Sequence, residues 1–147
     1  MSFVGAILAA VIFAIAGFLS FSTGTAWGTF GILIPIVVLV AQSIDPTSGS
    51  ELVIISLSAT LAGSVFGDHS SPISDTTVLS SAGAGCIHIE HVYTQLPYSA
   101  VVAVCAFIGY IIASFSYSLL HSFSSALVLM LLLIALLHKR QIKFAKA

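Results

Sequence analysis

The segment GDHSSPISDTT, residues 67–77, gathers two aspartates, a histidine and five hydroxyl side chains within eleven residues. Carboxylate and hydroxyl oxygens suit a small, hard cation such as Na⁺, and a carboxylate removed from water also holds a proton more readily. A carboxylate that holds a proton cannot bind a cation at the same time. The residue types therefore indicate a site that exchanges a cation for a proton.

The chain around this segment is apolar for dozens of residues on either side. Of its 147 residues, 59% are hydrophobic and 6% are charged, and the mean hydropathy is +1.16. Soluble domains carry about 25% charged residues, and these apolar runs are too long to be buried in one small core. We therefore expect an all-α polytopic membrane protein whose partner is the lipid bilayer, with no nucleic acid.

The same segment predicts a broken helix. Gly67 and Pro72 interrupt an apolar run that ends near Phe66, so we expect the helix to unwind there and to restart with Ser74 or Asp75 as its N-cap. Protein or a water-filled cavity must surround such a break, because backbone polar groups find no partner in lipid. Freed carbonyl groups and the negative end of the first half-helix would add to the oxygen-rich environment.

An ionisable side chain inside a membrane is costly and is by default a functional candidate. We therefore expect Asp68 and Asp75 to bind the ions, with neutral oxygens from the neighbouring hydroxyls. Packing is the favoured alternative for each hydroxyl taken singly, and Gly63 and Gly67 have the spacing of a close-packed helix pair. His69 is either a proton partner or a hydrogen-bonded structural residue.

A second polar interruption, STGTAWGT at residues 22–29, carries glycines and hydroxyls but no charge. Trp27 within it is either an aromatic anchor at the membrane interface or a wall of the site. Paired interruptions of membrane segments are the usual indication of a transporter site near the midplane.

The elements that position these residues form one transmembrane domain, 1–147. Residues 3–43 form either a re-entrant hairpin or two spans, and the short second apolar run slightly favours the hairpin. An interrupted helix follows at 52–84. The remaining elements are a connector at 86–96, two further transmembrane helices at 97–138 and a basic tail at 139–147.

All four basic residues lie in the last nine positions, so the positive-inside rule places the C-terminus of this multi-pass cell-membrane protein in the cytoplasm. Counting the spans back from there places the 86–96 connector in the cytoplasm too. His88, Glu90 and His91 in the connector either gate the site or sense pH, or they are solvated polar residues. Pro97 suits the start of the helix that follows.

Three motifs resemble the NhaC-type sodium/proton antiporter family: TGTAWGTFGILIPI at 23–36, GDHSSPISDTTVLSSAGAG at 67–85 and HVYTQLPY at 91–98. The resemblance covers nearly the whole chain, and the middle motif is long and specific. It implies exchange of Na⁺ and H⁺ without a cofactor, and a fold of inverted repeats that each contain a re-entrant hairpin and a broken helix. Family members are much longer, so the resemblance implies a C-terminal portion that works with an N-terminal transporter half or a second copy.

The resemblance also assigns residues to the site. At the break, where the two aspartates would hold Na⁺, the ion-binding residues are Asp68, Ser71, Ser74, Asp75, Thr76 and Thr77. The hairpin motif supplies Thr23, Gly24, Thr25, Trp27, Gly28 and Thr29. Two positions depart from the family pattern: Ser70 stands where many relatives have cysteine, and Ile87 stands where an acid is expected, which weakens the case for a gate in the connector.

We therefore expect a secondary active Na⁺/H⁺ antiporter, as a C-terminal fragment, and not an enzyme. One alternative is a Na⁺/H⁺-coupled antiporter of organic acids such as malate or lactate. Another is an inactive membrane fragment or an assembly subunit. An intramembrane protease is disfavoured, because Asp68 and Asp75 lie seven residues apart across a proline break and not on facing helices.

Overall fold

The computed structural model describes residues 3–44, 49–116 and 118–145, and nearly all of them are helical. Within these residues there are six helices and no strands, which confirms the all-α class. Residues 45–48, between the predicted first segment and the interrupted helix, lie outside the described residues, as do the last residues of the basic tail, 146–147. The helices are α1 (Phe3–Thr23), α2 (Ala26–Ile44), α3 (Gly49–Ser70), α4 (Asp75–Gly83), α5 (His88–Ser116) and α6 (Leu119–Ala145).

Four of these helices are long and apolar enough to cross a membrane: α2, α3 over Glu51–Ser70, α5, and α6 over Leu120–Leu137. α1 adds a shorter apolar stretch, Ile7–Thr23. Large apolar side chains such as Phe18 and Ile32 are exposed on the outside of the helices, as lipid contact requires. The chain is therefore a multi-pass α-helical membrane protein.

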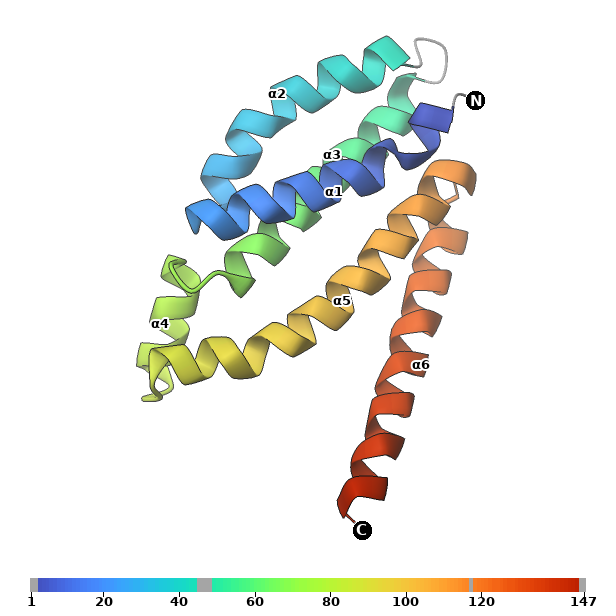
Figure 1. Ribbon diagram of the computed structural model, residues 1–147. Coiled ribbons are helices and arrows are strands. Elements are labelled where there is room, and N and C mark those ends of the chain that lie inside the picture. The colour runs from blue at the N-terminus through green and yellow to red at the C-terminus, as the bar shows by residue number, and fades with distance from the viewer. Residues whose placement is uncertain (1–2, 45–48, 117, 146–147) are drawn as a thin grey trace.

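α1 and α2 form a helical hairpin, and α3 runs along α1 in the same direction, so the end of α3 reaches the tip of the hairpin (Figure 1). α2 continues to Ile44, and its 19 residues rise about 28 Å, close to the ~30 Å thickness of a hydrocarbon core. The sequence favoured a re-entrant hairpin because its second apolar run is short, but the helix that contains this run is longer than the run itself. Two spans and a re-entrant hairpin both stay predictions.

Glycines allow α1 and α3 to approach each other closely. A Cβ atom at Gly63 would overlap the Phe13 carbonyl group, and one at Gly67 would overlap the Gly17 carbonyl group. Small residues at such a seam are the usual way for membrane helices to gain packing contacts. Buried alanines complete the seam: Ala9, Ala16 and Ala59.

The predicted end of the first half-helix is wrong. α3 does not end near Phe66 but continues through Gly67 and Asp68 to Ser70. Glycine has a weak helix preference, but the close contact of Gly67 with α1 stabilises the helix at this point. The unwound part is consequently shorter than predicted, and Asp68 lies in the last turn of α3.

The start of α5 also differs from the prediction. The helix begins at His88, so most of the predicted connector at 86–96 is helical, and Pro97 lies inside the helix instead of starting it. Proline removes a backbone donor and clashes with the preceding turn, and α5 bends along its length (Figure 1). Its 29 residues rise about 43 Å, more than one crossing needs. The first turns of α5 are therefore available for contacts with the helix break.

Candidate ion-binding site

The break between α3 and α4 spans residues 71–74. Ser74 is the N-cap of α4, and its hydroxyl accepts a hydrogen bond from the Thr76 amide at 3.2 Å. The Ser71 amide donates to the Asp68 carbonyl oxygen at 3.1 Å, which closes the last turn of α3. The interrupted helix is therefore present, and hydroxyl side chains satisfy part of its freed backbone.

Asp68 lies at the centre of a hydrogen-bonded cluster that bridges the break. The residue is 8% exposed. Its Oδ1 accepts from the Ser74 hydroxyl at 2.7 Å, and its Oδ2 accepts from the Thr76 hydroxyl at 3.2 Å. The ring nitrogen Nδ1 of His69, on a largely exposed side chain, lies 3.7 Å from Oδ2. Two hydroxyl groups thus take the place of water around a buried carboxylate.

The same hydroxyls can serve a cation. A hydroxyl that donates to Asp68 still has oxygen lone pairs, and rotation about its C–O bond turns them toward a neighbouring ion. The Ser74 and Thr76 hydroxyls lie 2.7 Å apart, so they are able to act together. The cluster can therefore solvate either the carboxylate alone or a cation bound to the carboxylate.

Asp75 does not belong to this cluster. It lies exposed on the first turn of α4, and the hydrogen bonds around the buried Asp68 do not include it. An acidic side chain in a first helical turn is favoured by the helix dipole, which accounts for this position without an ion. The hydrogen bonds therefore do not join the two aspartates into one cage.

The hairpin motif packs directly against the break. The Ser71 hydroxyl donates to the Phe21 carbonyl oxygen at 2.7 Å. Gly24 has a φ of 69°, and a Cβ atom there would lie 2.9 Å from the Ile73 carbonyl oxygen. Both the left-handed backbone and this close approach require glycine at the position. Two polar interruptions that are far apart in the sequence therefore lie side by side.

Most hydroxyls of the hairpin motif bond within the hairpin itself. The Thr29 hydroxyl donates to the Thr25 carbonyl oxygen at 2.8 Å and lies 3.4 Å from the Thr23 hydroxyl. The Gly28 amide donates to the Thr25 hydroxyl at 3.4 Å. Trp27 is 80% exposed, which fits an aromatic anchor at an interface and not a wall of the Asp68 cluster. The hydroxyls of the hairpin motif thus mainly stabilise the tip of the hairpin. Thr77 of α4 also bonds to the backbone: its hydroxyl donates to the His69 carbonyl oxygen at 3.4 Å.

Four further residues lie beside the break: the sequence analysis missed Ser20 and Gln95, and it named Ser70 and His88 without placing them in these contacts. Ser20 and Ser70 are buried, and their hydroxyls have no hydrogen-bond partner within the described part of the chain. His88 and Gln95 reach the break from α5 through hydrogen bonds to two of its carbonyl groups. The sequence signal that could have identified His88 and Gln95 is their seven-residue spacing, which places both on one face of a helix.

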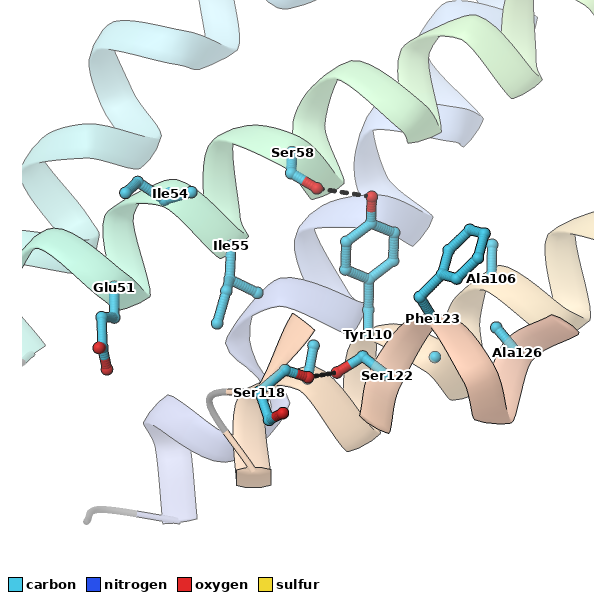
Figure 2. Close-up of a pocket in the computed structure, with 12 residues that line it drawn as sticks. Glu51, Ile54, Ile55, Ser58, Ala106, Tyr110, Ser118, Ser122, Phe123 and Ala126 are labelled. Atoms are coloured by element: carbon cyan, nitrogen blue, oxygen red, sulfur yellow. Dashed lines mark hydrogen bonds between the residues drawn. The ribbon is translucent and has the colours of Figure 1, made fainter. Parts of the chain in front are cut away.

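A separate cleft of about 520 Å³ lies between α3, α5 and α6 (Figure 2). Its lining is mostly apolar, and Glu51 stands at one end. Inside it the Ser58 and Tyr110 hydroxyls are hydrogen-bonded at 2.9 Å. Neither Asp68 nor its hydroxyl partners line this cleft, so it is distinct from the candidate ion site.

Comparison with known proteins adds a family to this geometry. The family model described as the Na⁺/H⁺ antiporter family matches residues 4–115. The chain is 49% identical over 133 residues to an uncharacterized protein of Haemophilus influenzae, and 36% identical over 95 residues to an uncharacterized Na⁺/H⁺ antiporter of the same organism. It is 32% identical over 103 residues to the malate-2H⁺/Na⁺-lactate antiporter of Bacillus subtilis.

The three matches cover 90%, 62% and 70% of this chain, but only 25%, 19% and 21% of the relatives. The chain thus spans about a quarter or less of the length of these curated relatives. No solved structure matches it. Because the family model covers most of the sequence, from the hairpin through the break into α5, the chain belongs to the Na⁺/H⁺ antiporter family.

Proposed function

We propose that this chain forms the ion-binding part of a secondary active Na⁺/H⁺ antiporter, and that Asp68 carries Na⁺ and protons in turn. The observation that carries the proposal is the buried Asp68 carboxylate, to which the Ser74 and Thr76 hydroxyls donate across a helix break. Membership of the Na⁺/H⁺ antiporter family supports it. On this proposal the chain is a transporter component and not an enzyme.

Exchange follows from the single shared carboxylate. A proton on Asp68 makes the carboxyl group neutral, so Na⁺ binds only when that proton leaves. The hydroxyls of Ser74 and Thr76 then turn their oxygens toward the ion, which replaces part of its hydration shell. Because one group serves both ions, their binding is mutually exclusive, and movement of the site between the two sides of the membrane couples the two flows.

Two neighbouring residues have secondary roles in this scheme. Asp75, exposed at the start of α4, attracts cations toward the break through its charge. His69 lies 3.7 Å from Asp68 Oδ2 on a largely exposed side chain, so it can pass protons between the carboxylate and water.

The proposed arrangement in the cell follows from the charge pattern and from the relatives. The basic C-terminal tail lies in the cytoplasm, by the positive-inside rule. The relatives are at least about four times longer than the region they share with this chain. An N-terminal transporter half or a second copy therefore completes the transport path.

The test is proton release by the purified chain when Na⁺ is added to a weakly buffered solution, with choline as the control cation. We expect release from the wild-type chain over a series of starting pH values and none from Asp68→Asn. Glu51→Gln is the matched control, because it removes an exposed carboxylate at the opposite end of α3. Release that persists in Asp68→Asn would exclude Asp68 as the exchanging group.

Exchange of an organic acid is the second candidate, because one relative is named as a malate-2H⁺/Na⁺-lactate antiporter. The helix N-terminus at the break belongs to α4, where Ser74 already caps an amide and Asp75 adds negative charge. A carboxylate ligand would be repelled there, so we place Na⁺/H⁺ exchange first. If the chain released protons when lactate or malate was added, but not when Na⁺ was added alone, exchange of an organic acid would become the first candidate.

A further inference from the structure

The first turns of α5 present one face to the helix break. His88, Val92 and Gln95 follow one another at positions i, i+4 and i+7, so they share a face of the helix. Val92 is buried and the two polar residues are half-buried, whereas Glu90 and Thr94 on the opposite face are exposed. This stretch thus has an apolar anchor with one polar side chain on each side of it.

The two polar side chains bind carbonyl groups of the break. His88 Nε2 lies 2.7 Å from the Pro72 carbonyl oxygen, and Gln95 Nε2 donates to the His69 carbonyl oxygen at 2.9 Å. A carbonyl oxygen only accepts hydrogen bonds, so the bonded nitrogen of His88 carries a hydrogen.

These carbonyl groups have lost their partners within the helix. In an unbroken α-helix each would accept a hydrogen bond from the amide four residues later. The amide of Ile73, four residues after His69, bonds to a serine hydroxyl instead, and so does the amide of Thr76, four residues after Pro72. The side chains of α5 therefore supply donors in place of those that the break removes, and the Thr77 hydroxyl adds a longer hydrogen bond to the His69 carbonyl oxygen.

His88 also connects to the far end of α4. Its second ring nitrogen, Nδ1, lies 3.1 Å from the Ser81 hydroxyl. Ser81 is buried in the last turns of α4, and its hydroxyl oxygen also lies 2.9 Å from the Val78 carbonyl oxygen. One imidazole ring thus joins the unwound stretch at Pro72 to α4, so the position of α4 depends on α5.

We propose that His88 and Gln95 are positioning residues of the Asp68 ion site; this role rests on the proposed function. Neither side chain contacts the carboxylate. Gln95 holds the residue next to Asp68 on α3, and His88 holds Pro72 in the stretch that leads to the hydroxyl donors. A shift of α5 therefore changes the separation between the carboxylate and the hydroxyls, and with it the affinity for Na⁺.

A purely structural role predicts something different. If the two side chains only satisfied carbonyl groups that the break leaves without helical partners, their loss would lower thermal stability by the same amount with and without Na⁺. In a positioning role, the half-saturating Na⁺ concentration rises as well, because the oxygens around Asp68 no longer match the ion. His88→Gln keeps an N–H donor and is expected to restore the wild-type value.

The experiment follows thermal unfolding of the full chain, purified in detergent, as NaCl replaces choline chloride. Wild type is expected to unfold at higher temperature as Na⁺ rises, because a ligand that binds only the folded state stabilises it. His88→Ala and Gln95→Leu are expected to raise the half-saturating Na⁺ concentration about three- to tenfold, and His88→Gln to stay within about twofold of wild type. His121→Ala, which removes an exposed histidine at the start of α6, is the matched control.

An unchanged half-saturating Na⁺ concentration in His88→Ala or Gln95→Leu overturns the positioning role, whatever their stability in choline. A wild-type chain that Na⁺ does not stabilise contradicts the proposed function, and the positioning role with it. For variants too unstable to purify, Na⁺ protection of the exposed Cys86 from a maleimide is measured in membranes, where the buried Cys105 is the internal reference. Protection curves identical to wild type overturn the role there too.

Discussion

Two aspartates of the same motif have opposite surroundings, and this divides their roles. Asp68 is buried in the last turn of α3 and accepts hydrogen bonds from two hydroxyls, at 2.7 and 3.2 Å. Asp75 is exposed in the first turn of α4, outside the hydrogen-bonded cluster around Asp68. A carboxylate surrounded by protein oxygens can exchange a bound ion for a proton, whereas an exposed one mainly alters the local potential.

Asp75→Asn is accordingly expected to leave the half-saturating Na⁺ concentration for proton release within about threefold of wild type, because Asp75 is exposed and outside the cluster of oxygens around Asp68, and an exposed charge contributes little. Asp68→Asn, by contrast, is expected to abolish the release. The measurement is the Na⁺ dependence of proton release in both variants. An equal loss of Na⁺-dependent proton release in the two variants would mean that both carboxylates bind the ion, as the sequence indicated.

Ser74 caps α4 through its acceptor oxygen and donates its hydrogen to Asp68 at 2.7 Å. Ser74→Ala removes the cap and leaves one oxygen of a buried carboxylate without its donor, so we expect the free energy of unfolding to fall by about 1–3 kcal/mol. Na⁺ binding is expected to weaken in parallel. Ser80→Ala is the control, since Ser80 is exposed on the same helix and its hydroxyl donates to the Thr76 carbonyl oxygen. Similar losses of stability in the two variants would refute the bridging role of Ser74.

At the residue scale the sequence identified the segment that contains the helix break, but not the different surroundings of its two aspartates. The cost of an ionisable side chain in a membrane applies to Asp68 and Asp75 alike. Their surroundings depend on the residue at which α3 ends, and packing against α1 sets that end. Ser20 was missed for a related reason: among the residues that the structure describes, its buried hydroxyl has no hydrogen-bond partner, and the sequence of an apolar run does not reveal this.

At the scale of elements, the site depends on how closely α1 and α3 approach. The Gly17 backbone contacts Gly67, one residue before Asp68, so the hairpin tip and the break are held together by a glycine seam. The Ser71 hydrogen bond to the Phe21 carbonyl oxygen continues this contact into the break. Separation of the two helices would therefore displace the carboxylate-bearing turn.

Gly67→Ala tests the seam. The added methyl group would overlap the Gly17 carbonyl group and crowd the Phe21 amide, so we expect a loss of about 1–3 kcal/mol in the free energy of unfolding, or more if the helices separate. Gly31→Ala is the control, because a Cβ atom at Gly31 of α2 meets open space. There the higher helix propensity of alanine is expected to add roughly 0.5–1 kcal/mol. A Gly67→Ala chain as stable as wild type would mean that the seam tolerates a wider spacing.

The sequence predicted the presence of the hairpin and of the interrupted helix, because Gly24 and Pro72 are strong local signals. It placed the start of α5 wrongly, because Pro97 is also a strong local signal, for a helix start. Side-chain hydrogen bonds from His88 and Gln95 to the break stabilise the turns that precede this proline. Contacts between distant segments outweigh a local preference here, and no local pattern reveals them.

For the whole molecule, composition alone predicted the membrane class, since 59% hydrophobic and 6% charged residues leave no soluble alternative. The contacts that assemble the candidate site come from α1, α3, α4 and the first turns of α5. α6 contributes apolar surface to the cleft with α3 and α5 instead (Figure 2). The proposed ion binding by these elements can therefore be measured separately from transport across a membrane.

We expect the chain alone to bind Na⁺ and release protons, but not to move either ion across a membrane. The two hydroxyls that donate to Asp68 in the described residues, those of Ser74 and Thr76, belong to this chain. Alternating access requires in addition a second repeat against which the hairpin and break can rock. The measurement is the pH change in everted vesicles after a Na⁺ pulse, with insertion checked by accessibility of the basic tail. Co-expression of the region of the Haemophilus relative that this chain does not match is expected to restore the Na⁺-driven pH change. A pH change with the chain alone would show instead that copies of these 147 residues form a complete transport path.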